Sequence, residues 1–514
     1  IPAALANRAT SDPGHVYLRL HDRVLTYGEI ERDAEALAAA FSNLGIEAGD
    51  RVALLLPPCP EFVVAMFAAA KLGATIVPLN PRLTISELKY VLRHSEAVCA
   101  VTVEHALGVD YLQLFEDLMP QLPELQYLAT VGEEDLWYDD RIFQFEDLIS
   151  AGAGRDFPAA ALDPGRDCFA IVYTSGTMGK PKGVELSHTN LIHTAAGTAD
   201  ALGLTESDRL GGVTALFHVF GLGPGLLSAV LVGASIILQD EADAAATLDL
   251  AEQHDATVHY GIPTLFVSEL AQLSARRRDL SSLRLAVVAG APVHDDLIAR
   301  IGDDLRVSVL NAYSLVETAS TLAVARIDHP ADKRRFTVGK PLPGTEIRIV
   351  ESSGEELPVE SVGEIAVKGP GVMLGYYRQP KETANAHDEK GYFLTGDLGL
   401  LDEEGYLHLV GRRKTVIIRS GFNVYPREVE TRIESHPAVQ EVAVIGMADA
   451  LLGEAICACI VLVEGAIVTG HEIVDWCRET LAEDKVPDLV RFLDGLPRTD
   501  TGQVRRVELS RVVQ

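Results

Sequence analysis

The sequence predicts an α/β protein with a large N-terminal domain of α/β sheets, a small β-rich subdomain and a small α+β C-terminal domain. The first indication is length, because 514 residues, 47% of them hydrophobic, suggest about two or three folding units. The second is an alternation of strand and helix patterns over residues 27–310. The third is a change near Arg335, after which glycine and proline are frequent and short alternating strands appear.

In the first part of the chain, apolar residues at helical spacing alternate with short apolar runs typical of buried strands. Such alternation favours open α/β sheets that bind ligands at the ends of their strands. The expected helices are Tyr27–Leu44, Glu61–Leu72, Glu87–His94 and Thr189–Leu202, and the expected strands are Arg51–Leu56, Ala74–Pro78, Val98–Thr102, Cys168–Tyr173, Ser235–Leu238, Val258–Tyr260, Leu285–Val288 and Val307–Leu310.

Two smaller units are expected after this part. Residues 335–411 contain short runs of alternating apolar and polar residues, which predict a small β-rich subdomain. Residues 415–514 combine strand and helix patterns over a length sufficient for a separate domain. The expected elements are strands Glu346–Val350, Gly363–Lys368 and Tyr406–Val410 in the first, and helix Pro426–Ser435, strands Val439–Met447 and Ala455–Val463, and helix Gly470–Ala482 in the second.

Charge and cysteine content narrow the class of protein. Lys and Arg number 44 against 74 Asp and Glu, a net charge of −30, which argues against nucleic acid or an anionic membrane surface as partner. An anionic small ligand remains compatible, because local amides and cations can hold it. The six scattered cysteines do not form a disulfide framework, and Cys457 and Cys459 are expected in a core. With no bilayer-length apolar run and no leader pattern, we expect a cytoplasmic protein that is a monomer or homodimer.

The strongest motif follows the predicted strand at Cys168. Residues 173–183 read Tyr-Thr-Ser-Gly-Thr-Met-Gly-Lys-Pro-Lys-Gly, with three glycines, three hydroxyls and two lysines. Such a loop can surround phosphate oxygens with backbone N–H groups and hydroxyl donors. The spacing is not that of a Walker A loop.

This segment resembles the phosphate loop of the superfamily of acyl- and aryl-CoA synthetases, nonribosomal adenylation domains and luciferases, the ANL superfamily. Further matching motifs follow in the right order over nearly the whole chain. They include Gly49–Val52, Pro78–Pro81, Leu216–His218, Pro263–Thr264, Ala289–Pro292, Thr395–Asp397, Gly411–Lys414, Ser420–Pro426 and Leu496–Thr499.

The resemblance implies two reactions. A carboxylate attacks the α-phosphate of ATP to give an acyl-adenylate and pyrophosphate, and a thiol then displaces AMP. It also implies a large domain of residues 1–411, a hinge at 412–414 and a small mobile domain of residues 415–514. The implied ligands are CoA and the AMP moiety of the acyl-adenylate, with ATP and Mg²⁺ needed only if adenylation is retained.

The resemblance also assigns site residues. Asp397 and Arg412 would bind the ribose, Glu317 would hold Mg²⁺, His218 would gate the acyl pocket and Lys414 would be the hinge pivot. The remaining expected nucleotide and pantetheine contacts are Thr174, Ser175, Gly176, Thr177, Lys182, Gly290, Ala291, Pro292, Asn311, Ala312, Tyr313, Ser314, Val316, Ser420, Gly421 and Phe422, and the expected acyl pocket includes Phe217, His218, Gly223, Tyr260, Gly261 and Ala289.

The chain departs from the family pattern in two motifs, and Met178 is a milder change in the phosphate loop; all of these departures concern phosphate handling. The C-terminal catalytic lysine is replaced by Gln503, a neutral amide that cannot offset phosphate charge. The threonine that contacts the α-phosphate is replaced by Val316, which has no donor, and Ser314 stands where the family has glycine. The motifs for ribose, adenine, hinge and tunnel are intact.

Three explanations compete for these departures. Gln503 would be an engineered change; or the protein would be a slow, complete ligase in which Arg498, Arg505 or Arg506 replaces the lysine. In the third, adenylation is lost and a separate adenylating enzyme supplies the adenylate. The third is favoured and resembles the split ligase pairs of natural-product pathways such as platensimycin and platencin biosynthesis. Loading of a carrier protein, and a pseudoenzyme that senses acyl-AMP or acyl-CoA, stay open as alternatives.

Overall fold

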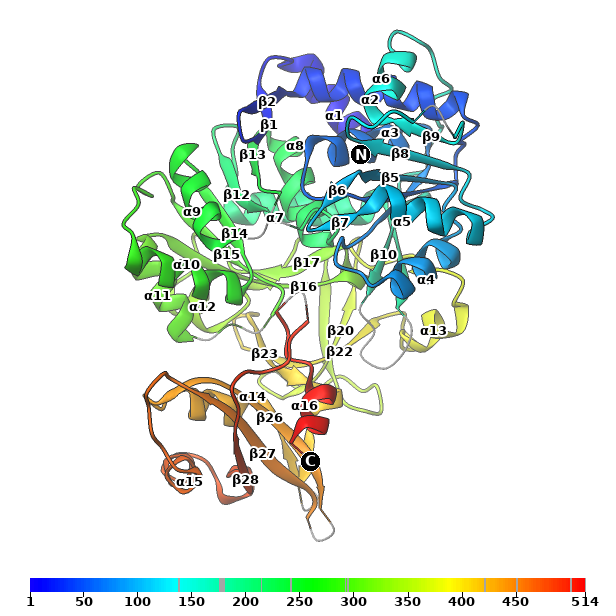
Figure 1. Cartoon of the computed structure of the whole chain (residues 1–514). Coiled ribbons are helices and arrows are strands. Elements are labelled where there is room, and N and C mark those ends of the chain that lie inside the picture. Colours follow the sequence, from blue (N-terminus) through cyan, green and yellow to red (C-terminus); the bar gives the residue numbers. More distant parts are fainter. Residues whose placement is uncertain are drawn as a thin grey trace.

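The computed structural model describes residues 1–136, 139–174, 181–213, 215–240, 243–291, 293, 295–419, 422–449, 452–499 and 502–513. Within these residues the strands form four main sheets and one short hairpin. Two large sheets build the N-terminal part, a four-stranded sheet follows, and the last sheet belongs to the C-terminal part (Figure 1).

The first large sheet has the strand order β21-β11-β10-β4-β3-β5-β8-β9, and its pairs from β10 to β9 are parallel. Its strands and the helices and hairpin beside them are β3 (Arg51–Leu55), β4 (Thr75–Pro78), β5 (Cys99–Val103), β6 (His105–Ala106), β7 (Val109–Asp110), β8 (Tyr127–Val131), β9 (Ile142–Gln144), β10 (Cys168–Thr174), β11 (Lys182–Ser187), β21 (Gly375–Tyr376), α2 (Tyr27–Asn43), α3 (Pro60–Leu72), α4 (Ile85–Ser95), α5 (Tyr111–Leu118), η1 (Met119–Gln121) and α6 (Phe145–Gly152).

The second large sheet has the order β18-β17-β16-β15-β14-β12-β13-β1-β2 and is parallel from β16 to β1. Its elements are α1 (Pro2–Ser11), β1 (Val16–Leu20), β2 (Arg23–Thr26), α7 (His188–Leu202), β12 (Arg209–Val213), the π-helical turn η2 (Gly221–Leu227), α8 (Ser228–Val232), β13 (Ser235–Leu238), α9 (Ala244–Gln253), β14 (Val258–Gly261), α10 (Pro263–Ala275), β15 (Leu285–Val288), α11 (Asp295–Leu305), β16 (Ser308–Leu315), η3 (Val316–Thr318), β17 (Ser320–Val324), α12 (Ala331–Phe336) and β18 (Lys340–Pro341).

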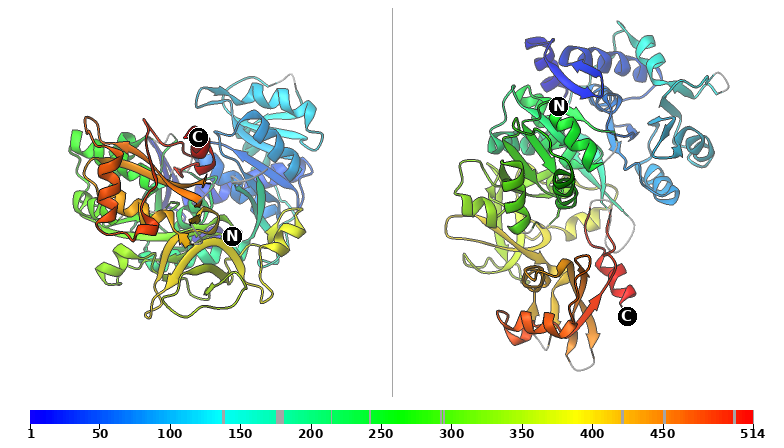
Figure 2. Two further views of the ribbon diagram at one scale, coloured as in Figure 1. Left: turned by 90° about the horizontal axis from the view of Figure 1, so that it is seen from below. Right: turned by 60° about the vertical axis from the view of Figure 1, so that its left-hand side comes forward.

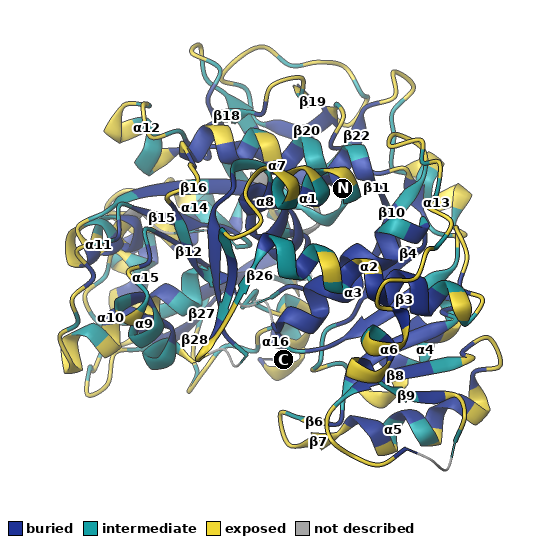
Figure 3. Ribbon diagram, turned by 90° about the horizontal axis from the view of Figure 1, so that it is seen from above, coloured by how far each residue is buried: buried dark blue, intermediate teal, exposed yellow. Residues whose placement is uncertain are grey.

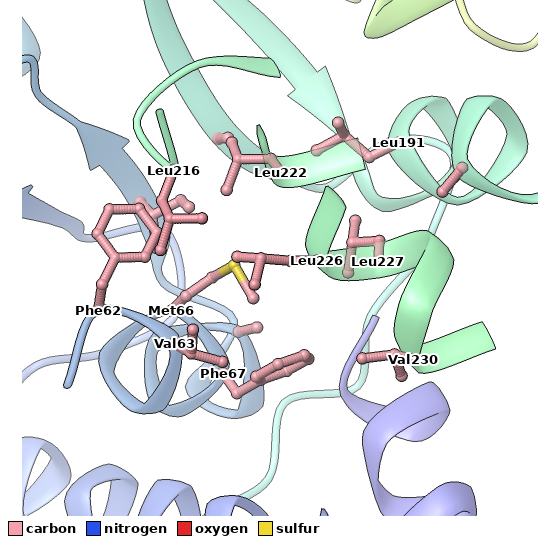
Figure 4. Close-up of a cluster of buried hydrophobic side chains, with 14 of the residues drawn as sticks. Phe62, Val63, Met66, Phe67, Leu191, Leu216, Leu222, Leu226, Leu227 and Val230 are labelled. Atoms are coloured by element: carbon pink, nitrogen blue, oxygen red, sulfur yellow. The ribbon is translucent and has the colours of Figure 1, made fainter. Parts of the chain in front are cut away.

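The main core joins these two sheets. Helix α3 is apolar and buried almost all round, which is the pattern of a helix enclosed between layers. Its C-cap is Gly73, whose φ of +75° is a conformation that glycine adopts without strain. Figure 4 shows Met66 of α3 beside Leu226 of the π-helical turn. The two large sheets therefore pack as one hydrophobic unit, with exposed residues gathered on outer helices and loops (Figure 3).

The two smaller sheets follow in the chain. The four-stranded sheet, order β19-β20-β22-β23, is antiparallel, and the C-terminal sheet has the path β25-β24-β27-β26 with β28 parallel to β27. Figure 2 shows the C-terminal unit at one end of the molecule. The elements are β19 (Glu346–Val350), β20 (Gly363–Lys368), α13 (Pro380–Asn385), β22 (Phe393–Leu401), β23 (Leu407–Arg412), η4 (Arg413–Thr415), β24 (Ile417–Arg419), β25 (Phe422–Val424), α14 (Pro426–Glu434), β26 (Val439–Asp449), β27 (Gly453–Leu462), α15 (Gly470–Arg478), η5 (Glu483–Lys485), β28 (Leu489–Phe492) and α16 (Arg506–Val512).

The fold class predicted from the sequence is confirmed: the fold is mixed α/β, with a large N-terminal and a small C-terminal domain. The expected helix 470–482 is shorter and ends at Arg478. The six cysteines are free thiols, and the expected core pair, Cys457 and Cys459, is buried. None of the described helices combines the length and apolar content that crossing a bilayer requires.

Candidate active site

The predicted ribose-binding carboxylate, Asp397, lies on β22 and is only 6% exposed. It accepts a hydrogen bond from the Tyr313 hydroxyl at 2.5 Å, and its Oδ1 is 2.8 Å from Nε of Arg412. Burial raises the pKa of Asp397, while Arg412 and the Tyr313 hydroxyl counteract that effect. The structure therefore brings three predicted nucleotide residues together around one buried carboxylate.

The predicted adenine loop begins where β15 ends, at Ala289. Gly290 has a φ of +88°, and an added Cβ would lie 3.3 Å from Cγ2 of Ile262, so a larger residue there would be strained. Asn311 pairs in register with Val288 on the neighbouring parallel strand. Ala291 follows in the loop, Ala312 lies on β16, and Pro292 is outside the described residues. The loop thus lies at the carboxyl ends of parallel strands, where α/β sheets bind ligands.

The two ends of the phosphate loop are fixed by strand pairing, since Thr174 of β10 pairs with Lys182 of β11. The predicted contacts Ser175, Gly176 and Thr177 lie outside the described residues.

Tyr376, which was not among the predicted site residues, links the end of the loop to Glu317. Lys182 Nζ is 4.3 Å from the centre of the Tyr376 ring, and the Tyr376 hydroxyl donates to Oε1 of Glu317 at 2.9 Å. Burial and the neighbouring carboxylate raise the pKa of Tyr376, so its hydroxyl keeps its proton as a donor.

Glu317 is the residue predicted to hold Mg²⁺. Mg²⁺ keeps several waters and is held in such sites through one or two carboxylates and substrate phosphates. Across the described ranges, no group of three or more His, Cys, Asp or Glu side chains is arranged to hold a metal. Glu317 would offer such an ion a carboxylate oxygen.

Three of the predicted acyl-pocket residues lie on η2 and β14, and Ala289 directly follows β15. Tyr260 is buried, and its ring meets that of Phe220 edge-on at 5.4 Å. An added Cβ on Gly261 would lie 2.7 Å from Phe266, so a side chain cannot fit there without a shift. Gly223 lies in the π-helical turn, a feature frequent at functional sites.

His218 and Phe217 precede the π-helical turn and are partly buried. Nδ1 of His218 accepts a hydrogen bond from the backbone N–H of Phe220 at 3.3 Å. Burial lowers the pKa of His218 to about 4. The imidazole is therefore neutral at pH 7.

This pKa predicts a pH-dependent stability. The folded protein disfavours protonation of His218, so its contribution to stability is complete above the ordinary histidine pKa and is lost as pH falls toward 4. Urea unfolding of His218→Gln should show a shallower loss of free energy of unfolding between pH 7 and pH 5, by on the order of 1 kcal/mol per pH unit. The exposed His471→Gln should keep the wild-type slope; equal slopes in all three proteins would contradict the assignment.

Gln503 reaches this site from the C-terminal domain. Its Nε2 donates to the backbone carbonyl oxygen of Gly290 in the adenine loop at 2.9 Å. Two bonds to Thr499 brace Gln503 within its hairpin: its carbonyl accepts from the Thr499 N–H at 2.7 Å, and its N–H donates to the Thr499 hydroxyl at 3.1 Å. In Figure 1 the red C-terminal segment extends from the small domain toward the large one. The residue in the lysine position thus lies at the predicted adenine loop as a neutral donor.

The three arginines that were candidates to replace the lysine each lie near a carboxylate of the C-terminal domain. Arg498 is 2.7 Å from Glu441, and Arg506 is 2.6 Å from Glu430. Nη1 of Arg505 lies 3.8 Å from the Glu508 carboxylate. In this arrangement Arg498 and Arg506 form ion pairs within their own domain.

The other departures lie on β16 and η3, and the residue predicted to be the hinge pivot lies in the turn η4. Val316 forms the start of η3 next to Glu317 and packs against the main core, and Ser314 pairs with Thr321. The backbone of Lys414 is in the turn η4. Of the predicted tunnel, Ser420 and Gly421 and the side chain of Phe422 lie outside the described residues.

Comparison with known proteins agrees with this geometry. Residues 5–377 match the family model of AMP-binding enzymes, and residues 428–503 match that of the AMP-binding enzyme C-terminal domain. The chain is 35% identical over 505 residues to feruloyl-CoA synthase of Amycolatopsis sp, covering 98% of this chain and 97% of that one.

Solved structures share the whole architecture. The anthranilate CoA ligase AuaEII with anthranoyl-AMP has a TM-score of 0.89 at 29% identity, covering 99% of this chain and 96% of its own. MatB from Rhodopseudomonas palustris, 30% identical and covering 99% and 98%, scores 0.90 with ATP bound and 0.81 as the apo protein. This chain therefore resembles the ATP-bound form of MatB more than the apo form. It belongs to the AMP-binding enzyme family, as an acyl- or aryl-CoA synthetase of the ANL superfamily.

Proposed function

We propose that this protein forms an acyl-CoA thioester from a preformed acyl-adenylate and CoA, and that the ATP-dependent adenylation step is lost or strongly weakened. The observation that carries the proposal is the position of Gln503, whose neutral amide lies on the Gly290 carbonyl. Adenylation accumulates negative charge around the α-phosphate, and its transition state needs cations and donors aimed there. Gln503 and Val316 remove one cation and one donor.

Thioester formation does not have the same requirement. The thiol sulfur attacks the acyl carbonyl carbon, the bond from that carbon to the phosphate oxygen breaks, and AMP leaves as the thiol proton passes to solvent. We propose that Asp397, Tyr313 and Arg412 hold the AMP moiety. We further propose that His218 gates the acyl pocket and that Ser420, Gly421 and Phe422 line the pantetheine path. The domains proposed for the rotation between steps are residues 1–411 and 415–514, joined by the hinge 412–414.

A complete ATP-dependent ligase is the second candidate. Two observations favour it: the domain arrangement resembles ATP-bound MatB, and relatives such as feruloyl-CoA synthase are named for the whole reaction. Arg498 and Arg506 already form ion pairs with glutamates of the C-terminal domain, which counts against either of them replacing the catalytic lysine.

The test compares the two half-reactions directly. Feruloyl-, anthraniloyl- and medium-chain acyl-adenylates are each supplied with CoA, and the corresponding acids are supplied with ATP, Mg²⁺ and CoA. We expect multiple turnovers to acyl-CoA, measured by mass spectrometry, from at least one adenylate and little pyrophosphate release from its acid. Pyrophosphate release at a comparable rate would establish the complete ligase instead. Failure with every adenylate would contradict both.

A further inference from the structure

A buried glutamate lies between the ribose-binding turn and the hinge. Glu364 on β20 is 5% exposed, and both of its carboxylate oxygens are engaged. Oε1 accepts a hydrogen bond from the backbone N–H of Gly396 at 3.0 Å, and Oε2 lies 2.6 Å from Nη1 of Arg413. One carboxylate therefore contacts both segments.

The first contact fixes the turn that presents Asp397. Gly396 has a φ of +73°, and the turn interrupts the pairing of β22 with β20. The Thr395 hydroxyl donates to the carbonyl oxygen of Ile365 at 2.9 Å and accepts from the N–H of Asp397 at 3.1 Å. With the bond from Gly396 to Glu364, the turn is attached to β20 at two successive residues.

The second contact fixes the chain immediately before the expected pivot. Arg413 opens the turn Arg413–Thr415, which connects the four-stranded sheet to the C-terminal sheet. The Arg413 side chain is half exposed, whereas that of Glu364 is 6% exposed. The buried, fixed partner of this ion pair is therefore Glu364, on the side of the large domain. Arg412 contacts Asp397 from the preceding position. Two consecutive arginines thus bind two buried carboxylates of one small sheet.

We propose that Glu364 is a positioning residue that clamps the chain at Arg413, so that rotation of the C-terminal domain is confined to Lys414 and is coupled to the ribose-binding turn. Rotation of the C-terminal domain can produce two defined catalytic arrangements only if the chain on one side of the pivot stays fixed. The inference about catalysis rests on the proposed function, whereas the clamp itself can be measured without turnover.

The variants Glu364→Gln and Arg413→Gln test the clamp. The amide oxygen of glutamine can still accept from Gly396, so the first variant loses mainly the charge that holds Arg413. Arg413→Lys keeps a charge and should recover part of the effect. The matched control is Arg348→Gln on β19 of the same sheet, which breaks an ion pair with Glu356 away from the hinge.

The main readout is the distance between spin labels at Lys381→Cys and Glu464→Cys, exposed positions in the two domains. In the wild-type protein and the Arg348→Gln control we expect narrow distance populations that shift when AMP is added. In Arg413→Gln and Glu364→Gln we expect broad populations and a weaker shift. Wild-type distances and a wild-type shift in Arg413→Gln would overturn the proposal, and this variant alone decides if Glu364→Gln fails to fold.

The second readout is thioester formation from the best acyl-adenylate. We expect kcat to fall about tenfold in Arg413→Gln with a smaller change in KM, because reacting groups are misplaced rather than unbound. An equal rise in KM with unchanged kcat would overturn the proposed role. If the wild-type protein uses no adenylate, the proposed function fails, and the label distances still decide the clamp.

Discussion

Replacing Gln503 with lysine should raise adenylation by about 10²–10³-fold, measured as ATP–pyrophosphate exchange with the acid of the best acyl-adenylate. The Gln503 amide already lies at the adenine loop, so a lysine at this position would place its charge in the nucleotide site. A charge aimed at the developing phosphate charge is worth far more in such a site than in water.

Two further variants separate charge from shape. Gln503→Met has a similar length without charge and should give no gain. Val316→Thr restores a hydroxyl beside Glu317 and should add to Gln503→Lys in the double variant, since each supplies a different group. No increase in the double variant would contradict the role that is proposed for these two substitutions.

Asp397→Asn should weaken acyl-adenylate binding by about 10- to 100-fold, seen as a rise in KM and in the dissociation constant for AMP. The asparagine keeps the shape of the side chain and removes its charge, and hydrogen bonds to charged groups contribute about 1.5–3 kcal/mol. The buried carboxylate is held between the Tyr313 hydroxyl and Arg412, so its loss also leaves Arg412 without its partner.

The pKa of Asp397 adds a second signature to this variant. Burial raises that pKa above the ordinary aspartate value, so the carboxylate, and AMP affinity with it, is lost as pH falls through the raised value. AMP titrations at successively lower pH should show this loss in the wild-type protein and not in Asp397→Asn. The control Asp402→Asn, which follows the end of the same strand and is paired with Lys333, should bind AMP as the wild type does. Unchanged affinity in Asp397→Asn would contradict the assigned role.

Local patterns predicted much of the fold. Strands β13 and β15 begin and end at the predicted residues, because short buried parallel strands read as continuous apolar runs. The π-helical turn Gly221–Leu227 was not predicted, because its glycines and Pro224 disfavour any helix locally. Packing between the two large sheets stabilises it instead, as its buried leucines show.

In the candidate site, too, local motifs predicted some features, and tertiary contacts determine the others. The substitutions at Gln503 and Val316 are visible in the sequence, because they interrupt recognisable motifs. The partner of Gln503 is not, since Gly290 lies 213 positions away in the chain. Tyr376 and Glu364 carry no motif signal of their own either; their roles come from tertiary contacts with Glu317 and Arg413.

The contact between Gln503 and Gly290 also bears on how ions in solution act on the molecule. A lysine at this position would dock the C-terminal domain partly by long-range attraction, which dissolved salt screens over about 8–10 Å. The amide attracts only at hydrogen-bond distance and carries no net charge for counterions to screen. The contribution of this hydrogen bond to the equilibrium between docked and rotated domains therefore depends on contact geometry. That contribution should be nearly independent of ionic strength.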